Sequence, residues 1–179
     1  MATGLNQLLN SPSGFRDLLR HIGFFVSALG LILTMVLGAT QGTTPGAQPG
    51  ETDSSYESPS PEEQAHLEEI RTELNTAILE LRHNATVKPA IMDPFELQVQ
   101  AQKWAEHTAV LGREEATDAN VAMIQHNLPV GEANAYNFVD AWIRSESHLN
   151  VLVDPEHTFY GIGVAQSQGR VWVAIQFSR

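Results

Sequence analysis

The sequence predicts an α+β domain in which helices pack on a small antiparallel sheet, preceded by one transmembrane helix and a disordered tether. Three observations predict this architecture. Residues 22–39 form an uncharged apolar run, three stretches between residues 61 and 148 carry apolar side chains at helical spacing, and residues 157–179 alternate as strands do. Helices followed by a terminal hairpin are typical of layered α+β domains.

The composition excludes several classes of protein. A chain of 179 residues has room for one domain and its appendages, which excludes a multidomain enzyme. It contains no cysteine, so disulfides, thiolate metal sites and cysteine nucleophiles are excluded. Ten Lys and Arg residues against 21 Asp and Glu residues give a net charge of −11. This charge argues against nucleic-acid binding, because phosphate backbones are bound by clustered basic side chains.

The apolar run 22–39, IGFFVSALGLILTMVLGA, is long enough to cross a bilayer. Arg16 and Arg20 precede it, and the next basic residue is Arg71. Because basic residues favour the cytoplasmic side, residues 1–21 are predicted to be cytoplasmic and the C-terminal domain extracytoplasmic. The chain is therefore predicted to be a single-pass protein of the cell membrane.

The span has two further predicted properties. We favour a retained signal anchor over cleavage and secretion, because the region before the span is long and no A-x-A site follows it. Small residues also share one helix face of the span, which permits close helix approach and predicts a homodimer through the membrane. These residues are Gly23, Ser27, Gly30, Thr34 and Gly38.

Residues 40–60 are rich in Gly, Pro, Ser and Thr and nearly free of apolar side chains, so they are predicted to be a disordered linker. The domain then occupies residues 61–179. Residues 40–179 hold twenty acidic and eight basic residues, a formal charge of −12. An acidic, cysteine-free exported domain suits a bacterial envelope.

The first helix of the domain is predicted to begin at the capping-box sequence Ser60-Pro61-Glu62-Glu63 and to end near Asn84. Its apolar positions recur every three or four residues and face a core. They are Leu67, Ile70, Leu74, Ile78 and Leu81.

Two more helices are predicted further along the chain. The second begins at Asp93-Pro94, where Asp93 caps it, and stops at Leu111-Gly112. The third covers residues 133–148.

Strands are predicted at the end of the chain. Apolar residues alternate from Tyr160 to Val164 and from Val171 to Phe177, with a turn at Gln166-Ser167-Gln168-Gly169 between them. The β-prone stretch 120–124 is predicted to add a third strand.

Short motifs follow one another in a fixed order through the domain. They are Arg82 with Pro89 and Asp93, Ala101 to Ala105, Asp118 to Ala122, Trp142 to His148, Asn150 to Leu152, Gly161 to Val164, and Trp172 to Phe177. This order resembles that of the CAP superfamily, also called SCP-like, which includes cysteine-rich secretory proteins, antigen 5 and the pathogenesis-related-one proteins. The chain looks like its cysteine-free bacterial branch. The resemblance implies an α-β-α layered domain.

The chain departs from the family in the cleft that the resemblance implies. That cleft commonly holds two histidines and two glutamates, which can take a divalent metal. Here Ala119 stands at the glutamate of the family's "GEN" motif, and residues 105–119 are too few for the loop that bears the first histidine. His148 is the cleft residue that is clearly retained. The resemblance thus implies a reduced cleft, and we predict neither a metal nor a cofactor.

Four residues are candidates for a ligand cleft: His148, Ser145, Glu146 and Asn120. Ser145 and His148, three residues apart, are predicted to share one helix face, but triads are usually assembled from separate segments and no G-x-S-x-G elbow is present. Hydrogen bonds that brace the helix end are the preferred interpretation, and no catalytic residue is predicted.

A metal site is a weaker hypothesis. The seven histidines show no H-x-x-x-H or H-E-x-x-H spacing. Only a gathering of His148 with Glu146 or Glu115 in the fold would make a site.

Two functions therefore remain open. The first is a non-enzymatic binding module that holds a lipid, a glycan or an envelope protein outside the cytoplasm. The second is a hydrolase that acts on peptides or the cell wall through the CAP cleft. The loss of the glutamate at Ala119 favours the binding module.

Overall fold

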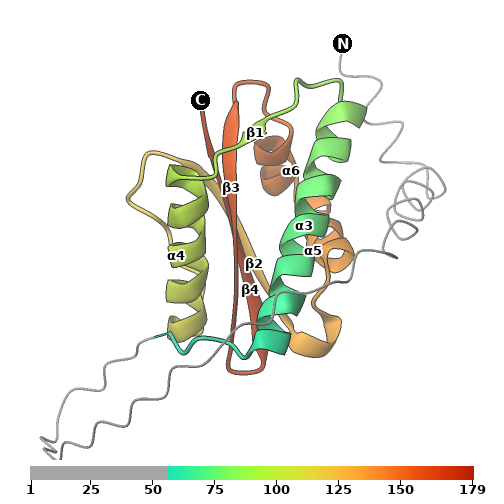
Figure 1. Cartoon of the computed structure of the whole chain (residues 1–179). Helices are drawn as coiled ribbons and strands as arrows, with labels where there is room; N and C mark the ends of the chain where they lie inside the picture. The colour runs from blue at the N-terminus through green and yellow to red at the C-terminus, as the bar shows by residue number, and fades with distance from the viewer. Residues whose placement is uncertain (1–55) are drawn as a thin grey trace, which may run out of the picture.

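The computed structural model describes residues 56–179, which form helices on both faces of one four-stranded sheet. Helix α4 covers one face, and α3, α5 and α6 lie on the other (Figure 1). The α-β-α layering is as expected. The predicted cytoplasmic segment 1–21, the predicted span 22–39 and most of the predicted linker 40–60 lie outside the described residues. Within residues 56–179, no helix combines the length and the apolar character needed to cross a membrane.

Helix α3 (Pro61–Asn84) begins and ends where the sequence predicts. The Ser60 hydroxyl accepts the Glu63 N–H at 3.3 Å, and the Glu63 carboxylate accepts the Ser60 N–H at 2.9 Å, which completes the capping box. These bonds also hold the pKa of Glu63 below its usual value. All five predicted core positions of this helix are buried.

Helix α4 (Glu96–Leu111) is capped by the side chain of Asp93, three residues before its first residue, and not by its N-cap residue Phe95. The Asp93 carboxylate accepts the N–H groups of Phe95 at 2.9 Å, Leu97 at 3.3 Å and Glu96 at 3.4 Å. These hydrogen bonds lower the pKa of Asp93. At the other end Gly112 adopts a φ of 67°, a left-handed conformation that glycine tolerates best.

The single helix predicted over residues 133–148 is wrong, because the structure divides it into α5 (Ala135–Ile143) and α6 (Glu146–Leu152). Ser145 is extended, with φ −102° and ψ 113°, and is the N-cap of α6. Both helices bury residues on the same side of the sheet, Trp142 from α5 and Leu149 from α6. The change of direction at Ser145 lets both apolar faces reach the core.

The predicted hairpin is confirmed as β3 (Phe159–Ser167) and β4 (Arg170–Ser178). Its turn residues, Gln168 and Gly169, both have positive φ, as two-residue hairpin turns of type I′ require. The third predicted strand is longer than expected, β2 (Ala122–Pro129), and pairs antiparallel with β4.

The prediction of a purely antiparallel sheet is wrong. A two-residue strand, β1 (Ile91–Met92), pairs parallel with β3, so the order is β1-β3-β4-β2. The Ile91 N–H donates to the Thr158 carbonyl at 2.8 Å, and the Asp93 N–H donates to the Tyr160 carbonyl at 2.9 Å. A pairing this short leaves no alternation in the sequence to detect.

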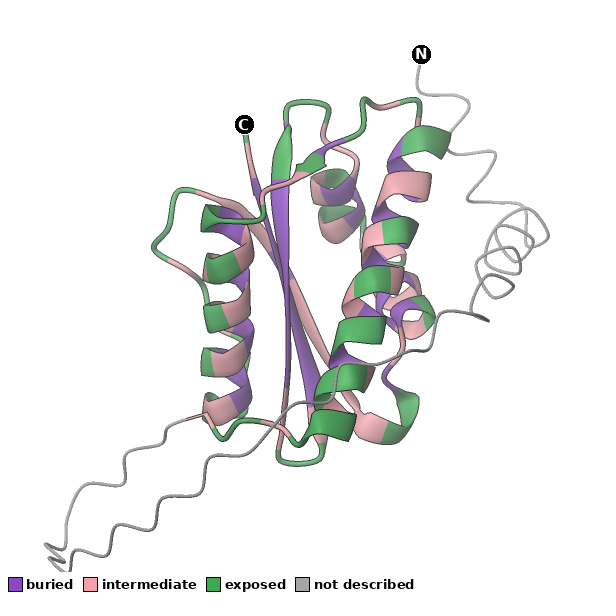
Figure 2. Cartoon of the chain, viewed as in Figure 1, coloured by how far each residue is buried: buried purple, intermediate pink, exposed green. Residues whose placement is uncertain are grey.

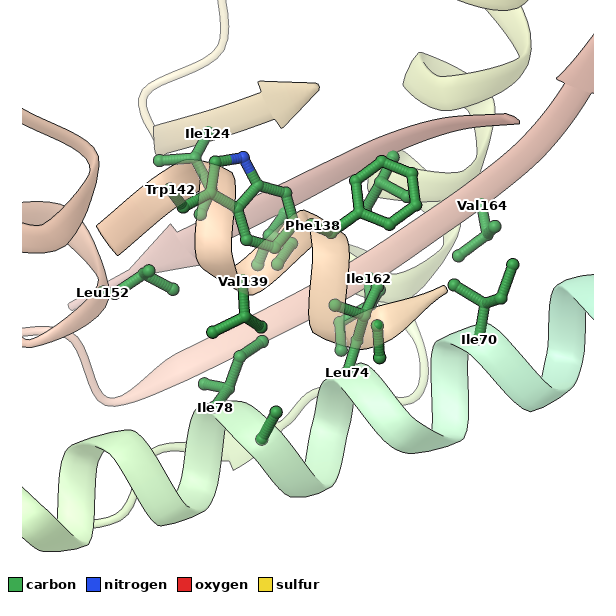
Figure 3. Packing of buried hydrophobic residues seen from close by; sticks show 14 of the residues in the cluster. Ile70, Leu74, Ile78, Ile124, Phe138, Val139, Trp142, Leu152, Ile162 and Val164 are labelled. Atoms are coloured by element: carbon green, nitrogen blue, oxygen red, sulfur yellow. The ribbon is translucent and has the colours of Figure 1, made fainter. Parts of the chain in front are cut away.

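The main core lies between the sheet and α3, α5 and α6. Figure 3 shows Ile70, Leu74 and Ile78 of α3 facing residues of α5 and β3. The middle residues of β3 and β4 are all buried, because helices cover both faces of the hairpin (Figure 2).

Arg82 joins the end of α3 to two loops. Its side chain is fully buried, and its guanidinium donates to the backbone carbonyls of Lys88, Leu152, Asp154 and His157 at 2.8–3.2 Å. Burial lowers the pKa of Arg82, although the nearby Asp154 opposes the shift. This arginine, the first residue of the family-like motif series, therefore has a structural role.

Candidate functional site

Three of the four candidate residues lie on or beside α6. Ser145 is its N-cap residue, Glu146 is exposed in its first turn, and His148 is half-buried one residue before the core residue Leu149. Within the described residues, the side chain of His148 makes no hydrogen bond and no ion pair.

The structure does not pair Ser145 with His148. The Ser145 hydroxyl lies 3.0 Å from the Ser147 hydroxyl and makes no capping hydrogen bond to the helix. The prediction that the two side chains share a helix face is wrong, because the helix begins only after Ser145. A serine needs a base within hydrogen-bond reach to become a nucleophile, and no such pair is present between these two residues.

Asn120, the fourth candidate, lies elsewhere. It is exposed in the loop before β2 and lines a pocket of about 610 Å³. We call this cavity the apolar pocket. Its other walls come from β1, the first turns of α4 and the ends of the hairpin. The lining residues are Ile91, Met92, Asp93, Pro94, Glu96, Leu97, Gln100, Ala119, Asn120, Val121, Phe159 and Ser178. Ser145, Glu146 and His148 are not among them, so the four candidates do not form one site.

Sequence reasoning missed this pocket as a site. Its apolar residues come from three segments that are distant in the sequence: 91–97, 119–121 and the start of β3. One signal was visible in the sequence, since Ile91, Met92 and Phe95 are large apolar residues beside the predicted helix start at Asp93-Pro94. The structure leaves Phe95 79% exposed.

Glu115, the more distant acidic partner considered for His148, pairs with other residues. Its carboxylate lies 3.2 Å from the His107 ring and 2.6 Å from the Arg113 guanidinium. The hydrogen bond from His107, and then that from Arg113, lower the pKa of Glu115. Among residues 56–179, no three His, Asp or Glu side chains gather in a way that could hold a metal ion.

His157 is a buried histidine to which the sequence analysis gave no role. Its ring stacks on Phe177 at 5.2 Å, and its Nδ1 lies 3.0 Å from the Val151 carbonyl. Its Nε2 lies 3.7 Å from the Asp154 carboxylate. These contacts fix the loop between α6 and β3, so His157 is a packing residue.

A model of the cysteine-rich secretory protein family, CAP, matches residues 80–176. The chain belongs to this family. The match begins near the end of α3 and ends in β4, so it includes β1, β2 and β3 and all but the last two residues of β4. The absence of cysteine fits the bacterial branch that the motif order indicates.

Solved structures of low sequence identity resemble this chain to different degrees. An outer surface protein from Borrelia burgdorferi is 17% identical over 60% of this chain and 91% of that one, with a TM-score of 0.50. Hookworm platelet inhibitor is 16% identical over 64% of this chain and 69% of its own, with a TM-score of 0.48. An extracellular SCP-domain protein from Bacillus anthracis is 12% identical over 69% and 45%, with a TM-score of 0.45. Among curated proteins, none matches the chain.

In this CAP domain, Ala119 places a methyl group where the family-like motif has a carboxylate. Ala119 is exposed and lines the apolar pocket beside Asn120 and Val121. The apolar residues of this lining can bury apolar ligand surface, and Ala119 itself supplies no acid or base.

Proposed function

We propose that this chain is an extracytoplasmic CAP-domain protein, tethered to the membrane by residues 22–39, that binds a ligand and does not catalyse hydrolysis. The observation that carries the proposal is the isolation of His148. Its ring has no hydrogen-bonding partner among the described residues, and Ser145 bonds to Ser147 instead. In serine hydrolases such a histidine is hydrogen-bonded to the nucleophile and oriented by a third group.

The apolar pocket supports a binding role. Seven of its twelve lining residues are apolar: Ile91, Met92, Pro94, Leu97, Ala119, Val121 and Phe159. Ligand sites are typically concave and largely apolar, with a few polar groups that orient the ligand. Asn120, Gln100 and Ser178 are the uncharged polar groups at this site.

A hydrolysis assay tests the proposed absence of catalysis. It compares the full chain with its His148→Ala variant on peptide and peptidoglycan substrates. Neither protein should release product. His83→Ala removes an exposed histidine from the end of α3 and is the matched control. Cleavage by the wild type and by His83→Ala that is lost in His148→Ala, with unchanged circular dichroism, would establish the hydrolase instead. Removing an acid-base group typically lowers a rate about 10²–10⁴-fold, which is easily measured.

The membrane tether is supported by sequence alone, through the uncharged run 22–39 and the arginines before it. Protease added to intact cells should release the domain by cutting in residues 40–55. Complete protection would contradict the proposed orientation. Release of the domain without protease would indicate secretion after cleavage of the signal segment.

Self-association through the membrane is a separate part of the proposal. Gly30 lies at the centre of the row of small residues, and Gly30→Leu should block close helix approach. A membrane two-hybrid signal that is unchanged by Gly30→Leu would exclude the dimer.

A further inference from the structure

The end of the domain that carries the apolar pocket is also its most exposed apolar surface. Phe95 is 79% exposed, Ile91 63%, Val99 49% and Phe159 42%. Ile91 and Phe159 line the pocket, and they also pair with each other between β1 and β3. Phe95 directly precedes α4, and Val99 lies one helical turn further along. We call these four residues and the pocket the β1 surface.

The charge of the β1 surface is acidic. Asp93 and Glu96 line the pocket, and no Lys, Arg or His is among its lining residues. Asp118 directly precedes the lining residue Ala119 and is exposed. Arg179 directly follows the lining residue Ser178, but its guanidinium is paired with the Glu156 carboxylate at 3.0 Å. The Asp93 carboxylate already accepts the first N–H groups of α4. The start of this helix therefore has no free donors for an anionic ligand.

This charge decides between occupants. Residues 40–55 of the same chain carry Glu51 and Asp53 and no basic residue, so the tether is repelled. A second copy would bring the same acidic groups, and an anionic lipid would bring its headgroup charge. Repulsion between like charges therefore disfavours the tether, a second copy of the chain and an anionic lipid as occupants of the β1 surface.

The position of the surface also separates it from the anchor. Residues 56–60 pass beneath the C-terminal end of α4, whereas the β1 surface lies at the N-terminal end of that helix (Figure 1). The sixteen residues of α4 separate the two ends by about 24 Å at 1.5 Å per residue. The chain thus enters the domain at the end opposite the pocket.

We propose that the β1 surface docks a partner polypeptide that presents apolar side chains next to Lys or Arg. The apolar side chains would enter the pocket between Leu97, Val121 and Phe159, and the cations would lie near Glu96 and Asp118. This proposal rests on the proposed binding function and names the chemistry of its ligand. Apolar contact supplies the affinity, and the acidic rim selects the partner.

The experiment titrates the full chain into short fluorescein-labelled peptides and follows fluorescence anisotropy. One peptide alternates leucine and lysine, a second replaces each lysine with glutamate, and a third replaces each leucine with serine. Only the first should bind, and its affinity should fall as salt increases. Vesicles of phosphatidylcholine, with and without phosphatidylglycerol, test the lipid occupants.

Two pairs of variants locate the binding. Phe95→Ser should weaken binding of the leucine-lysine peptide about tenfold, which corresponds to roughly 1.4 kcal/mol of binding free energy. Leu111→Ser, an exposed apolar residue at the other end of α4, should leave it unchanged. Glu96→Lys should weaken binding about fivefold or more, whereas Glu62→Lys should not. Both of these glutamates lie in the first turn of a helix. Reversing their charge should therefore lower the stability of α3 and of α4 by a similar free energy.

The outcomes separate this inference from the proposed function. Equal binding of the glutamate peptide, preference for anionic vesicles, or equal effects of Phe95→Ser and Leu111→Ser would overturn the inference. Binding of phosphatidylcholine vesicles without binding of the basic peptide would overturn it while a binding function remains. Cleavage of the peptides that depends on His148 would overturn the proposed function.

Discussion

The two faces of the β3–β4 hairpin are packed by different means. Toward α3, α5 and α6 the hairpin presents large side chains, such as Tyr160, Ile162 and Phe177, that fill the main core. Toward α4, β3 presents Gly161, Gly163 and Ala165, and β4 presents Trp172 and Ala174. One face is filled by large apolar side chains from both strands. On the other face β3 has almost no side-chain volume, so the backbone of α4 approaches it closely, while Trp172 of β4 packs in a smaller cluster with Ala105 and Ala109 of α4.

Hydrogen bonds add to the contact on the α4 face. The Gln98 amide donates to the Ile162 carbonyl at 2.7 Å and accepts the Ile162 N–H at 3.1 Å. Gln102 makes the same pair with Val164 at 3.0 and 3.1 Å. These side chains bond the edge of β3 beyond the point where β1 ends. The Gln166 N–H, next along the edge, donates to the Tyr56 hydroxyl at 3.1 Å.

A sheet edge with unpaired backbone groups is open to pairing with other chains. Here β1, two glutamines of α4 and one tyrosine cover successive outward-facing groups of β3. Tyr56 lies within the segment predicted as a linker, so the contacts of the domain start before residue 61. The α4 face thus depends on close approach and polar pairing, whereas the opposite face depends on apolar volume.

The largest expected effect tests the close approach. A Cβ at Gly163 would lie 1.9 Å from the Ala101 carbonyl oxygen, which is backbone and cannot rotate away. Gly163→Ala must therefore displace α4, and we expect a loss of more than about 3 kcal/mol of unfolding free energy, above the usual cost of overpacking. Urea denaturation measures it. Gly131→Ala, where nothing lies within 4 Å, is the control. Equal stability of the two variants would mean that α4 does not pack this closely.

The opposite face should respond to the loss of volume. Leu74 has 0% exposure in the main core (Figure 3). Leu74→Ala removes buried methyl groups and leaves a cavity, which costs about 3 kcal/mol. Leu111→Ala makes the same change where the side chain is 41% exposed and should cost well under half as much. Similar shifts of the urea midpoint in both variants would contradict the assignment of the core.

The polar pairing should contribute less. Gln98→Met keeps the length of the side chain but leaves the Ile162 N–H without its acceptor, at a cost of about 1–2 kcal/mol, whereas the Ile162 carbonyl keeps the Arg71 Nε donor at 3.2 Å. Gln100→Met is the matched control, because within residues 56–179 the amide of Gln100 bonds to the exposed Glu96 side chain alone. Faster hydrogen exchange of the Ile162 amide in the first variant alone would confirm the pairing. Unchanged exchange in both would refute it.

The contrast between the faces also explains what the sequence can predict. Large apolar residues at helical or alternating spacing identified α3, the hairpin and the main core. The side chains that fill a core recur along the sequence with the period of their helix or strand, so they can be recognised there. On a helix of unknown register, Gln98 and Gln102 look like solvent-facing residues. Only the position of α4 against β3 makes them partners of the strand.

The candidate site was predictable only in part. The motif order placed the chain in the CAP family, and Asn120 does line a pocket. The break at Ser145 carries no glycine or proline, so nothing local indicates that Ser145 and His148 lie on different elements. The apolar pocket depends on contacts between segments that are distant in the sequence, and such contacts have no periodicity.

The smallest expected effect is a pH dependence at the start of α4. Hydrogen bonds from Phe95, then Leu97 and Glu96, lower the pKa of Asp93 in the folded state. A lowered pKa means that Asp93 stabilises the fold above its unfolded pKa of about 3.9, and that this contribution is lost as the pH falls through the lower folded value. Asp93→Asn is uncharged throughout. The urea midpoint of this variant should therefore lie below that of the wild type at neutral pH, and the difference should shrink in acid.

Asp118→Asn is the control, because it removes an exposed carboxylate that accepts no hydrogen bond from the described residues. Its difference in urea midpoint from the wild type should change less with pH. A deficit of Asp93→Asn that stays constant from neutral to acidic pH would show that the carboxylate does not cap α4 through its charge.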